Sequence, residues 1–270
     1  MLRAARRAGV PVRIAHSHNT SSEGGPAARL FKRLAGSFVL PNASALLACS
    51  ERAASWLFRG KAADSRILKN GIDCSRFAFD ADVRRNARAE LELAESRLVV
   101  GHIGRFNRQK NHAYLLDVFA AIVRRRPDAV LLLCGDGALR EEIARKAESL
   151  RLADHVRYLG VREDVHRLLQ AMDVLVFPSF HEGLPVSLVE AQGAGLPCLV
   201  SDGVTREADL GLGLMRFMSL KRPPDEWADR AIEASAGRVA TAKEQLRAQG
   251  YDARENAAWL ESFYRRCALP

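Results

Sequence analysis

The sequence predicts an α/β fold built on parallel sheets. From residue 98 onward, short apolar runs alternate with helical patterns. The apolar runs have strand length and cover residues 98–103, 129–134, 156–159, 174–177 and 198–201; the helical patterns cover 114–125, 138–150, 165–171 and 186–194. Strands that alternate with helices of this length pair in parallel, because each helix carries the chain back along the sheet. We therefore expect one doubly wound sheet in this part of the chain.

A smaller α/β domain is predicted for residues 1–94. Its strands are expected at 10–15, 45–49 and 66–69, and its helices at 1–8, 26–37 and 50–58. Asn70-Gly71 is a turn signal, and a charged helix over 80–93 leads into the second domain, expected at 95–250. Further helices are predicted at 223–236 and 252–266, and residues 251–270 form a separate C-terminal segment.

The composition is that of a globular cytoplasmic protein. Of 270 residues, 48% are hydrophobic and 27% are charged, and the longest apolar runs are far shorter than a membrane-spanning helix. The first ten residues are charged rather than apolar, so no signal peptide is predicted. The five cysteines show no paired spacing, which favours reduced structural thiols.

The net charge of +9 is concentrated near the N-terminus, because residues 1–40 hold seven Lys or Arg and one acidic residue. Three interpretations stay open: a solvated arginine-rich face, peripheral contact with the anionic inner face of the plasma membrane, and nucleic-acid binding. The sequence shows no aromatic-rich basic strand, zinc knuckle or helix-turn-helix pattern, so nucleic acid is the least favoured partner.

Residues 177–197, FPSFHEGLPVSLVEAQGAGLP, form the most informative stretch. A buried strand ends at Pro178, a polar turn follows, and a helix is predicted from Val186. The N-terminus of such a helix carries free N–H groups and a positive dipole end, which together attract anions. Glu182 and Glu190 flank this point. A carboxylate beside a phosphate site is electrostatically unfavourable unless it binds another group, such as the hydroxyls of a sugar. The stretch therefore predicts a site for a nucleotide-sugar.

Two cations follow the first strand of the second domain. Arg105 comes directly after Gly104, and Lys110 lies five residues later in the same loop. At the carboxyl end of a strand they could converge on a diphosphate, Arg as a fork and Lys as a mobile point charge. The alternative is that both cations lie on the solvated surface and bind no ligand. After the next strand, Arg140 stands where a dinucleotide fingerprint requires its third glycine, which argues against an NAD-dependent oxidoreductase.

Several motifs in order resemble those of glycosyltransferase family 4, whose members are retaining enzymes of the GT-B fold. They are His16-Ser17-His18-Asn19, Gly104-Arg105 with Lys110-Asn111, Glu182-Gly183-Leu184-Pro185 with Glu190, and Gly195-Leu196-Pro197. The closest similarity is to bacterial exopolysaccharide and capsule glycosyltransferases, and it extends from about Val12 to Trp227. The resemblance implies a complete C-terminal Rossmann-like domain, a partial N-terminal Rossmann-like domain, and a last helix that crosses back to the N-terminal domain.

The resemblance also implies roles for single residues. Arg105 and Lys110 hold the donor's diphosphate and replace the metal that other transferases use, so no metal and no cofactor is expected. Glu182 contacts the donor sugar near the reacting centre, and a histidine, His16 in preference to His18, faces that sugar. The remaining donor-binding positions are Gly104, the backbone at Val161 for the base, Glu190 for the ribose, and the phosphate cradle of Gly183, Leu184, Pro185 and Ser187.

The implied activity is retaining transfer of a hexosyl unit from a nucleotide-diphosphate sugar, with a UDP-sugar favoured. The acceptor would be a polysaccharide repeat or a lipid-linked glycan. By the same resemblance, a full N-terminal domain needs further strand–helix units before Val10. The alternative is therefore a nucleotide-binding remnant, or a subunit that is inactive until a second copy or a partner chain completes it.

Overall fold

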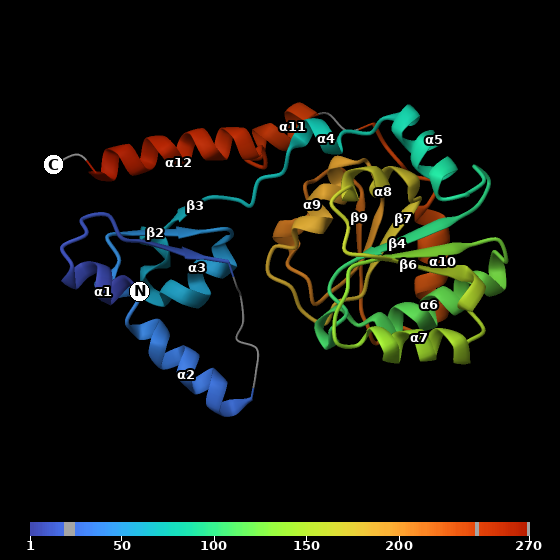
Figure 1. The fold of residues 1–270 in the computed structure, drawn as a ribbon, viewed down its shortest axis with the longest axis horizontal. Helices are drawn as coiled ribbons and strands as arrows, with labels where there is room; N and C mark the ends of the chain where they lie inside the picture. The colour runs from blue at the N-terminus through green and yellow to red at the C-terminus, as the bar shows by residue number, and fades with distance from the viewer. Residues whose placement is uncertain (19–24, 241–242, 269–270) are drawn as a thin grey trace. The chain divides into compact units, whose positions relative to one another are not determined.

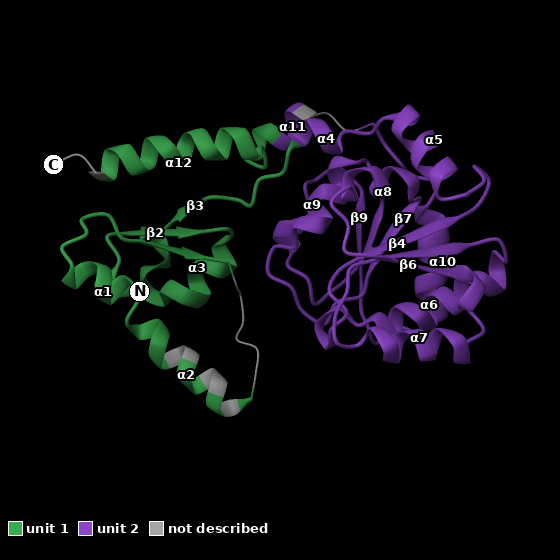
Figure 2. Ribbon diagram, in the orientation of Figure 1, with its two compact units in different colours: residues 1–73, 247–270 green, residues 74–246 purple. Residues whose placement is uncertain are grey.

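The computed structural model describes residues 1–18, 25–240 and 243–268, and the chain divides into two compact units (Figures 1 and 2). Unit 1 contains residues 1–73 and 247–270, and unit 2 contains residues 74–246. Every pair of neighbouring strands in the two sheets is parallel. The predicted α/β fold class is confirmed. The first segment of unit 1 ends at Asp73, earlier than the boundary drawn from the sequence at residue 94.

Unit 2 is built on a six-stranded sheet in the order β6-β5-β4-β7-β8-β9. The strands are β4 (Val99–Ile103), β5 (Val130–Cys134), β6 (Val156–Gly160), β7 (Val174–Phe177), β8 (Cys198–Ser201) and β9 (Met215–Met218). All residues of β5, β7 and β8 are buried, as expected for parallel strands covered on both faces. The edge strand β9 was not predicted, because only its first residue is buried and its run is short.

The strand order reverses between β4 and β7. From β4 the chain proceeds outward through β5 and β6, and it then returns to place β7 on the other side of β4. In open parallel sheets, ligands bind outside the carboxyl ends of the strands at such a reversal. The loops that follow β4 and β7 are therefore the parts of unit 2 best placed to bind a ligand.

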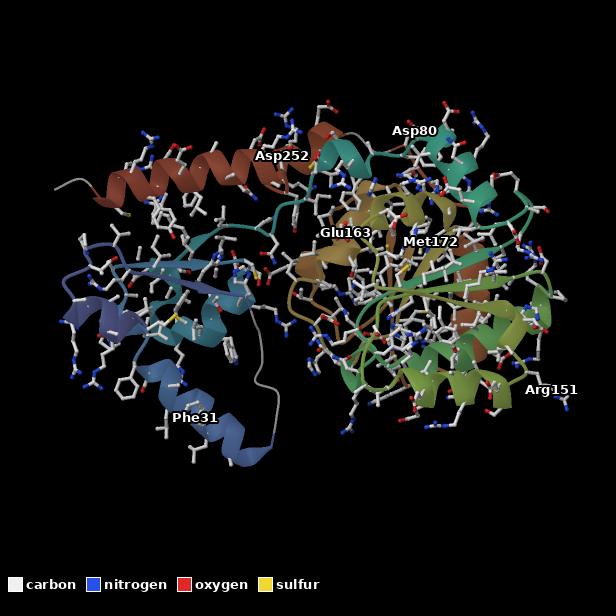
Figure 3. The ribbon with its side chains drawn as sticks, in the orientation of Figure 1. Phe31, Asp80, Arg151, Glu163, Met172 and Asp252 are labelled. Atoms are coloured by element: carbon white, nitrogen blue, oxygen red, sulfur yellow. The ribbon has the colours of Figure 1, made fainter. Side chains whose placement is uncertain are left out.

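Helices cover both faces of this sheet (Figure 1). One core joins alternate strand residues to the apolar faces of α6 (His112–Arg125), α7 (Arg140–Ser149) and α10 (Pro224–Ala234). Figure 1 shows α5 (Ala81–Glu90), α8 (Val165–Ala171) and α9 (Val186–Gly193) on the opposite side, and α5 packs against α8. Asp80 begins α5 by accepting hydrogen bonds from the backbone N–H groups of Asp82 and Val83, at 2.7 and 3.1 Å (Figure 3).

A buried cation fastens α5 to the amino end of the sheet. The side chain of Arg88 is only 1% exposed and donates hydrogen bonds to the carbonyl oxygens of Ala171, Ala94 and Arg97 at 2.6–2.9 Å. Asp173 provides the balancing charge: it pairs with Arg84 at 2.7 Å and with Arg88 at 3.3 Å, and also accepts from the backbone N–H of Val99 at 2.8 Å. Carbonyl groups and a carboxylate thus replace the water that Arg88 loses on burial.

Unit 1 holds a three-stranded sheet in the order β1-β2-β3, formed by β1 (Ile14–Ser17), β2 (Ala45–Ala48) and β3 (Arg66–Ile67). Its helices include α1 (Leu2–Arg7), α2 (Pro26–Ser37) and α3 (Glu51–Phe58). Ser50 caps α3, since its Oγ accepts from the backbone N–H of Ala53 at 3.1 Å. Phe31 on α2 is 71% exposed, and Figure 3 labels its side chain on the surface of that helix.

The C-terminal helix α12 (Ala253–Ala268) belongs to unit 1. Ile72 donates its backbone N–H to the carbonyl of Tyr251 at 2.7 Å, and Ala253 donates to the carbonyl of Ile72 at 3.0 Å. A Cβ on Gly71 would lie 2.6 Å from the Cα of Ala253, so only glycine permits this approach. Asp252, labelled in Figure 3, begins α12 by accepting two backbone N–H groups.

The bounds of β1 differ from those predicted from the sequence. The sequence placed a strand at residues 10–15 and His16 in the loop that follows, but the strand begins at Ile14 and contains His16, which pairs in register with Leu47. The physical reason is that Ser17 is also buried and continues the ladder by accepting the backbone N–H of Cys49 at 3.0 Å. Asn19, the last residue of the predicted histidine motif, lies outside the described residues.

We predict that Arg88→Met destabilises unit 2 by about 3–5 kcal/mol, because it leaves Asp173 and three carbonyl groups without their buried cation. The matched control is Arg85→Met, one helical turn away from Arg88 on α5, where the side chain is 63% exposed and pairs with Asp82. The control should change the unfolding free energy by less than about 0.5 kcal/mol. Urea unfolding of the two variants compares these values, and equal small losses would contradict the structural role of Arg88.

Candidate active site

The loop between β4 and α6, residues 104–111, carries the two predicted cations. Lys110 ends a 3₁₀ helix, Arg108–Lys110, that is capped by the Oδ1 of Asn107, which accepts from the backbone N–H of Lys110 at 3.1 Å. The aliphatic stem of Lys110 lies over Gly104, where an added Cβ would be 2.9 Å from its Cε. Arg105 is exposed, and no ion pair of its side chain is found among residues 1–18, 25–240 and 243–268. Glycine at 104 therefore lets Lys110 fold back over the end of β4.

The loop between β7 and α9, residues 178–185, carries Glu182 and leads into the predicted anion site. Glu182 forms an isolated parallel bridge with Val204, which follows β8. Helix α9 begins at Val186, the predicted start, with Pro185 in the N-cap position. No side chain caps this helix and no acidic residue lies in its first turn. Its first N–H groups lack intrahelical acceptors, so they are oriented to bind an anion.

Lys110 and Glu182 form an ion pair that joins the two loops. The Nζ of Lys110 lies 2.8 Å from the Oε1 of Glu182, and the two side chains are only 15% and 10% exposed. The same Nζ lies 4.4 Å from the ring centroid of Phe177, a cation–π contact. Among the described residues, the Oε1 of Glu182 finds no hydrogen-bond partner of good geometry. This largely buried pair is thus held by charge, and Glu182 can still accept hydrogen bonds from a ligand.

Glu190 lies on α9, downstream of the anion site. Its side chain is half-buried, and burial raises the pKa of its carboxyl group above the ordinary value. A carboxylate in this position is stabilised by any hydrogen-bond donor that reaches it. Hydroxyl groups of a bound ribose would supply such donors. Ser187, three residues earlier on the same helix, is also partly exposed.

Two buried histidines lie behind the cationic loop, and the sequence analysis did not select either. His102 on β4 and His112 at the start of α6 have ring centroids 4.6 Å apart, and His112 stacks on Phe106 at 4.2 Å. The Nδ1 of His102 donates to the carbonyl of Val176 at 2.8 Å, whereas the other ring nitrogens of the pair have no hydrogen-bond partner in the part of the chain that the structure describes. Burial and, to a smaller degree, the charge of Lys110 lower the pKa of both rings, that of His112 to about 4. They therefore pack as neutral rings.

The predicted site residues lie in three regions of the structure. Most of the donor-binding set lies on the two loops and α9: Gly104, Arg105, Lys110, Glu182, Gly183, Leu184, Pro185, Ser187 and Glu190. Val161 follows β6, two strands away from β4, and is 80% exposed. His16 lies in unit 1, with its ring centroid 4.1 Å from that of His18. Burial, followed by the neighbouring His18, lowers the pKa of His16 to about 4.

Within the described part of the chain, no three His, Cys, Asp or Glu side chains gather in a way that could hold a metal ion. None of the helices in the same part of the chain is both long and apolar enough to cross a membrane.

We predict that His112→Phe removes part of the acid sensitivity of unit 2. Between pH 6.5 and about 4 the unfolded chain binds a proton at His112 that the folded chain does not, so stability falls as the pH is lowered through this window. This contribution is at most about 3 kcal/mol. Phenylalanine keeps the stacking on Phe106 and removes two unpaired nitrogens, so stability at pH 7 should be unchanged or higher. Urea unfolding across this pH range checks both effects, and a slope equal to that of the wild type would refute the neutral state of His112.

Known proteins share both the sequence and the fold. The family model described as glycosyl transferases group 1 matches residues 83–210. A putative glycosyltransferase, EpsF of Bacillus subtilis, is 43% identical over 274 residues, which cover 97% of this chain and 70% of EpsF. The UDP-Gal:alpha-D-GlcNAc-diphosphoundecaprenol alpha-1,3-galactosyltransferase of Escherichia coli is 33% identical over 139 residues, covering 50% of this chain and 36% of that protein.

A solved structure shows the same fold. The crystal structure of Anabaena Alr3699/HepE in complex with UDP and glucose superposes with a TM-score of 0.82 over 99% of this chain and 74% of that one, at 21% sequence identity. Such low identity supports the fold alone, whereas the relation to EpsF extends over most of both sequences. On that relation and the family match, this chain belongs to the group 1 glycosyltransferases.

Proposed function

We propose that this glycosyltransferase moves a hexosyl unit from a UDP-sugar to a polysaccharide-repeat or lipid-linked acceptor, with retention at the sugar. The observation that carries the proposal is the Lys110–Glu182 ion pair, formed by the loops at the strand-order reversal and near the N-terminus of α9. The names of similar proteins support the substrate classes: one uses UDP-Gal and a diphosphoundecaprenol-linked acceptor, and another was solved with UDP-glucose.

The diphosphate of the donor is assigned to the β4–α6 loop and α9. Arg105 is exposed and offers a planar fork of donors to phosphate oxygens, while Lys110 offers a point charge. The uncapped N-terminus of α9 adds N–H groups and a positive dipole end. These groups replace a metal ion in neutralising the departing UDP. On the same proposal the backbone near Val161 contacts the base.

The sugar is assigned to Glu182. When a diphosphate neutralises Lys110, the attraction that holds Glu182 against Lys110 weakens, and the carboxylate becomes available to accept hydrogen bonds from sugar hydroxyls. Glu190, whose pKa is raised by burial, would accept from the ribose. The contact between His16 and the sugar is carried over from the family resemblance, so it stays a prediction.

The chemistry we propose is electrostatic. The bond between the anomeric carbon and the diphosphate oxygen breaks, and an oxocarbenium-like centre develops while the positive groups stabilise the departing oxygen. The acceptor hydroxyl then attacks from the same face, and the leaving phosphate takes its proton. This path needs no side-chain nucleophile, and it accounts for retention. The assignment to family 4 and the retaining outcome rest on the motifs named above.

The test of the donor site is calorimetric titration with UDP and GDP. We expect saturable binding of UDP, weakened about tenfold or more by Arg105→Ala, since a charge-assisted hydrogen bond contributes about 1.5–3 kcal/mol. Arg108→Ala is the matched control, because Arg108 is an exposed cation of the same loop. It should change affinity by less than about threefold, the scale of an exposed charge. A folded protein that binds neither nucleotide refutes the proposal, and UDP binding without transfer favours the nucleotide-binding remnant.

A second test separates the ribose from the phosphates. Glu190→Ala should weaken UDP binding about tenfold, because it removes an acceptor for ribose hydroxyls in a half-buried position. Pyrophosphate has no ribose, so its affinity should stay within about twofold of the wild-type value and serves as the internal control. Equal losses for both ligands would place Glu190 at the phosphates, or in the folding of α9, rather than at the ribose.

A further inference from the structure

Three hydrogen bonds join the β4–α6 loop to the β7–α9 loop in addition to the ion pair. Gln109 makes two of them: its carbonyl accepts from the backbone N–H of Phe180 at 2.9 Å, and its Nε2 donates to the carbonyl of His181 at 2.9 Å. Asn111 makes the third, donating from Nδ2 to the carbonyl of Pro178 at 3.2 Å. Gln109 and Asn111 are the two sequence neighbours of Lys110. The contacts with Gln109 lie immediately before Glu182.

The conformation of Asn111 fits this bridging role. Its backbone is left-handed, with φ 55° and ψ 45°, a conformation that asparagine tolerates better than most residues. Asn111 occupies the N-cap position of α6, yet its side chain does not cap that helix. The amide reaches the neighbouring loop instead. Gln109 is only half-buried, so its side chain contributes little to the core of unit 2.

The ion pair cannot hold the loops together throughout the proposed reaction. On the proposed function, the donor diphosphate takes over the charge of Lys110 and Glu182 turns to the sugar. The attraction between the two side chains is then at its weakest, at the stage when their spacing has to match the phosphate and the sugar of one donor molecule. The three hydrogen bonds involve neutral groups, so a diphosphate does not compete with them by charge.

We propose that Gln109 and Asn111 are positioning residues that fasten the two loops to each other. The loops then hold Lys110 and Glu182 in place when the bound donor has weakened the ion pair. The proposal rests on the proposed function for the roles of Lys110 and Glu182. The fastening itself depends only on the geometry of unit 2. Gln109 and Asn111 act through Lys110 and Glu182 and need no contact with the substrate.

Two substitutions remove the side-chain bonds while preserving the backbone. Gln109→Ala deletes the amide that donates to His181, and Asn111→Gly deletes the amide that donates to Pro178 while keeping the left-handed conformation. Arg108→Ala, between the two positions, is the control. Hydrogen exchange of the full chain should show residues 179–183 exchanging about fivefold faster in the two variants, and unchanged in the control, because each lost bond contributes about 1 kcal/mol.

The kinetic readout distinguishes positioning from folding. Hydrolysis of UDP-glucose, with water as acceptor, should lose about tenfold in kcat in each variant, since small misplacements of reacting groups cost about this much or more. The affinity for UDP should change by less than about threefold, and the thermal midpoint by less than about 2 °C, because both side chains are at least partly exposed. If Gln109 and Asn111 were needed only for folding, their substitution would lower the thermal midpoint and the affinity for UDP together.

Each outcome decides a separate point. Unchanged exchange in residues 179–183 would overturn the fastening. Faster exchange with unchanged kcat would overturn the positioning role. A wild-type protein that neither binds UDP nor hydrolyses UDP-glucose would overturn the proposed function and with it the positioning role, whereas the exchange measurement would still decide whether Gln109 and Asn111 fasten the loops.

Discussion

The parallel pairing of β4 with β7 is the constraint on which the candidate site depends. Val100 pairs in register with Val174, and Gly101 with Leu175, although these residues lie more than seventy positions apart in the sequence. The pairing places the ends of both strands at the same edge of the sheet. The loop that carries Lys110 then meets the loop that carries Glu182. Without this pairing, neither the ion pair nor the hydrogen bonds of Gln109 and Asn111 could form.

The two ends of the sheet use buried charge differently. At the amino end, Arg88 is enclosed by carbonyl groups and Asp173, which satisfy nearly all of its hydrogen-bonding capacity. At the carboxyl end, Lys110 and Glu182 hold each other with few other polar partners. A satisfied buried charge resists change, whereas an under-satisfied one exchanges its partner readily. One end of the sheet is therefore suited to stability and the other to binding.

Local patterns in the sequence predicted the parts of the fold that local interactions determine. The strand that ends at Phe177 and the helix that starts at Val186 were both predicted within a residue, because burial and backbone preference act over a few positions. The two cations and the two glutamates were likewise selected from strand ends and helix starts. The sequence could not reveal that Lys110 and Glu182 touch, since that contact follows from the order of strands in the sheet.

Other features of the structure were not predicted from the sequence, also for physical reasons. His102 and His112 carry polar atoms that a pattern of apolar residues does not expect in a core, and their burial depends on Phe106 and on each other. The edge strand β9 is short and mostly uncovered, so it lacks the apolar run that identified its neighbours. The sequence analysis placed His16 in the loop after the first strand of unit 1. It lies within that strand, because the pairing of β1 continues through Ser17.

The close approach of Gly71 to Ala253 has a consequence for the order in which the protein assembles during synthesis. Unit 2 is one continuous segment, residues 74–246, whereas unit 1 combines residues 1–73 with residues 247–270. Residues 71 and 72 of unit 1 make their contacts with residues 251 and 253, which are synthesised much later. Domains fold as units as they emerge. The contiguous unit can therefore fold from one stretch of chain, whereas residues 71 and 72 must wait for a distant later segment before they gain their partners.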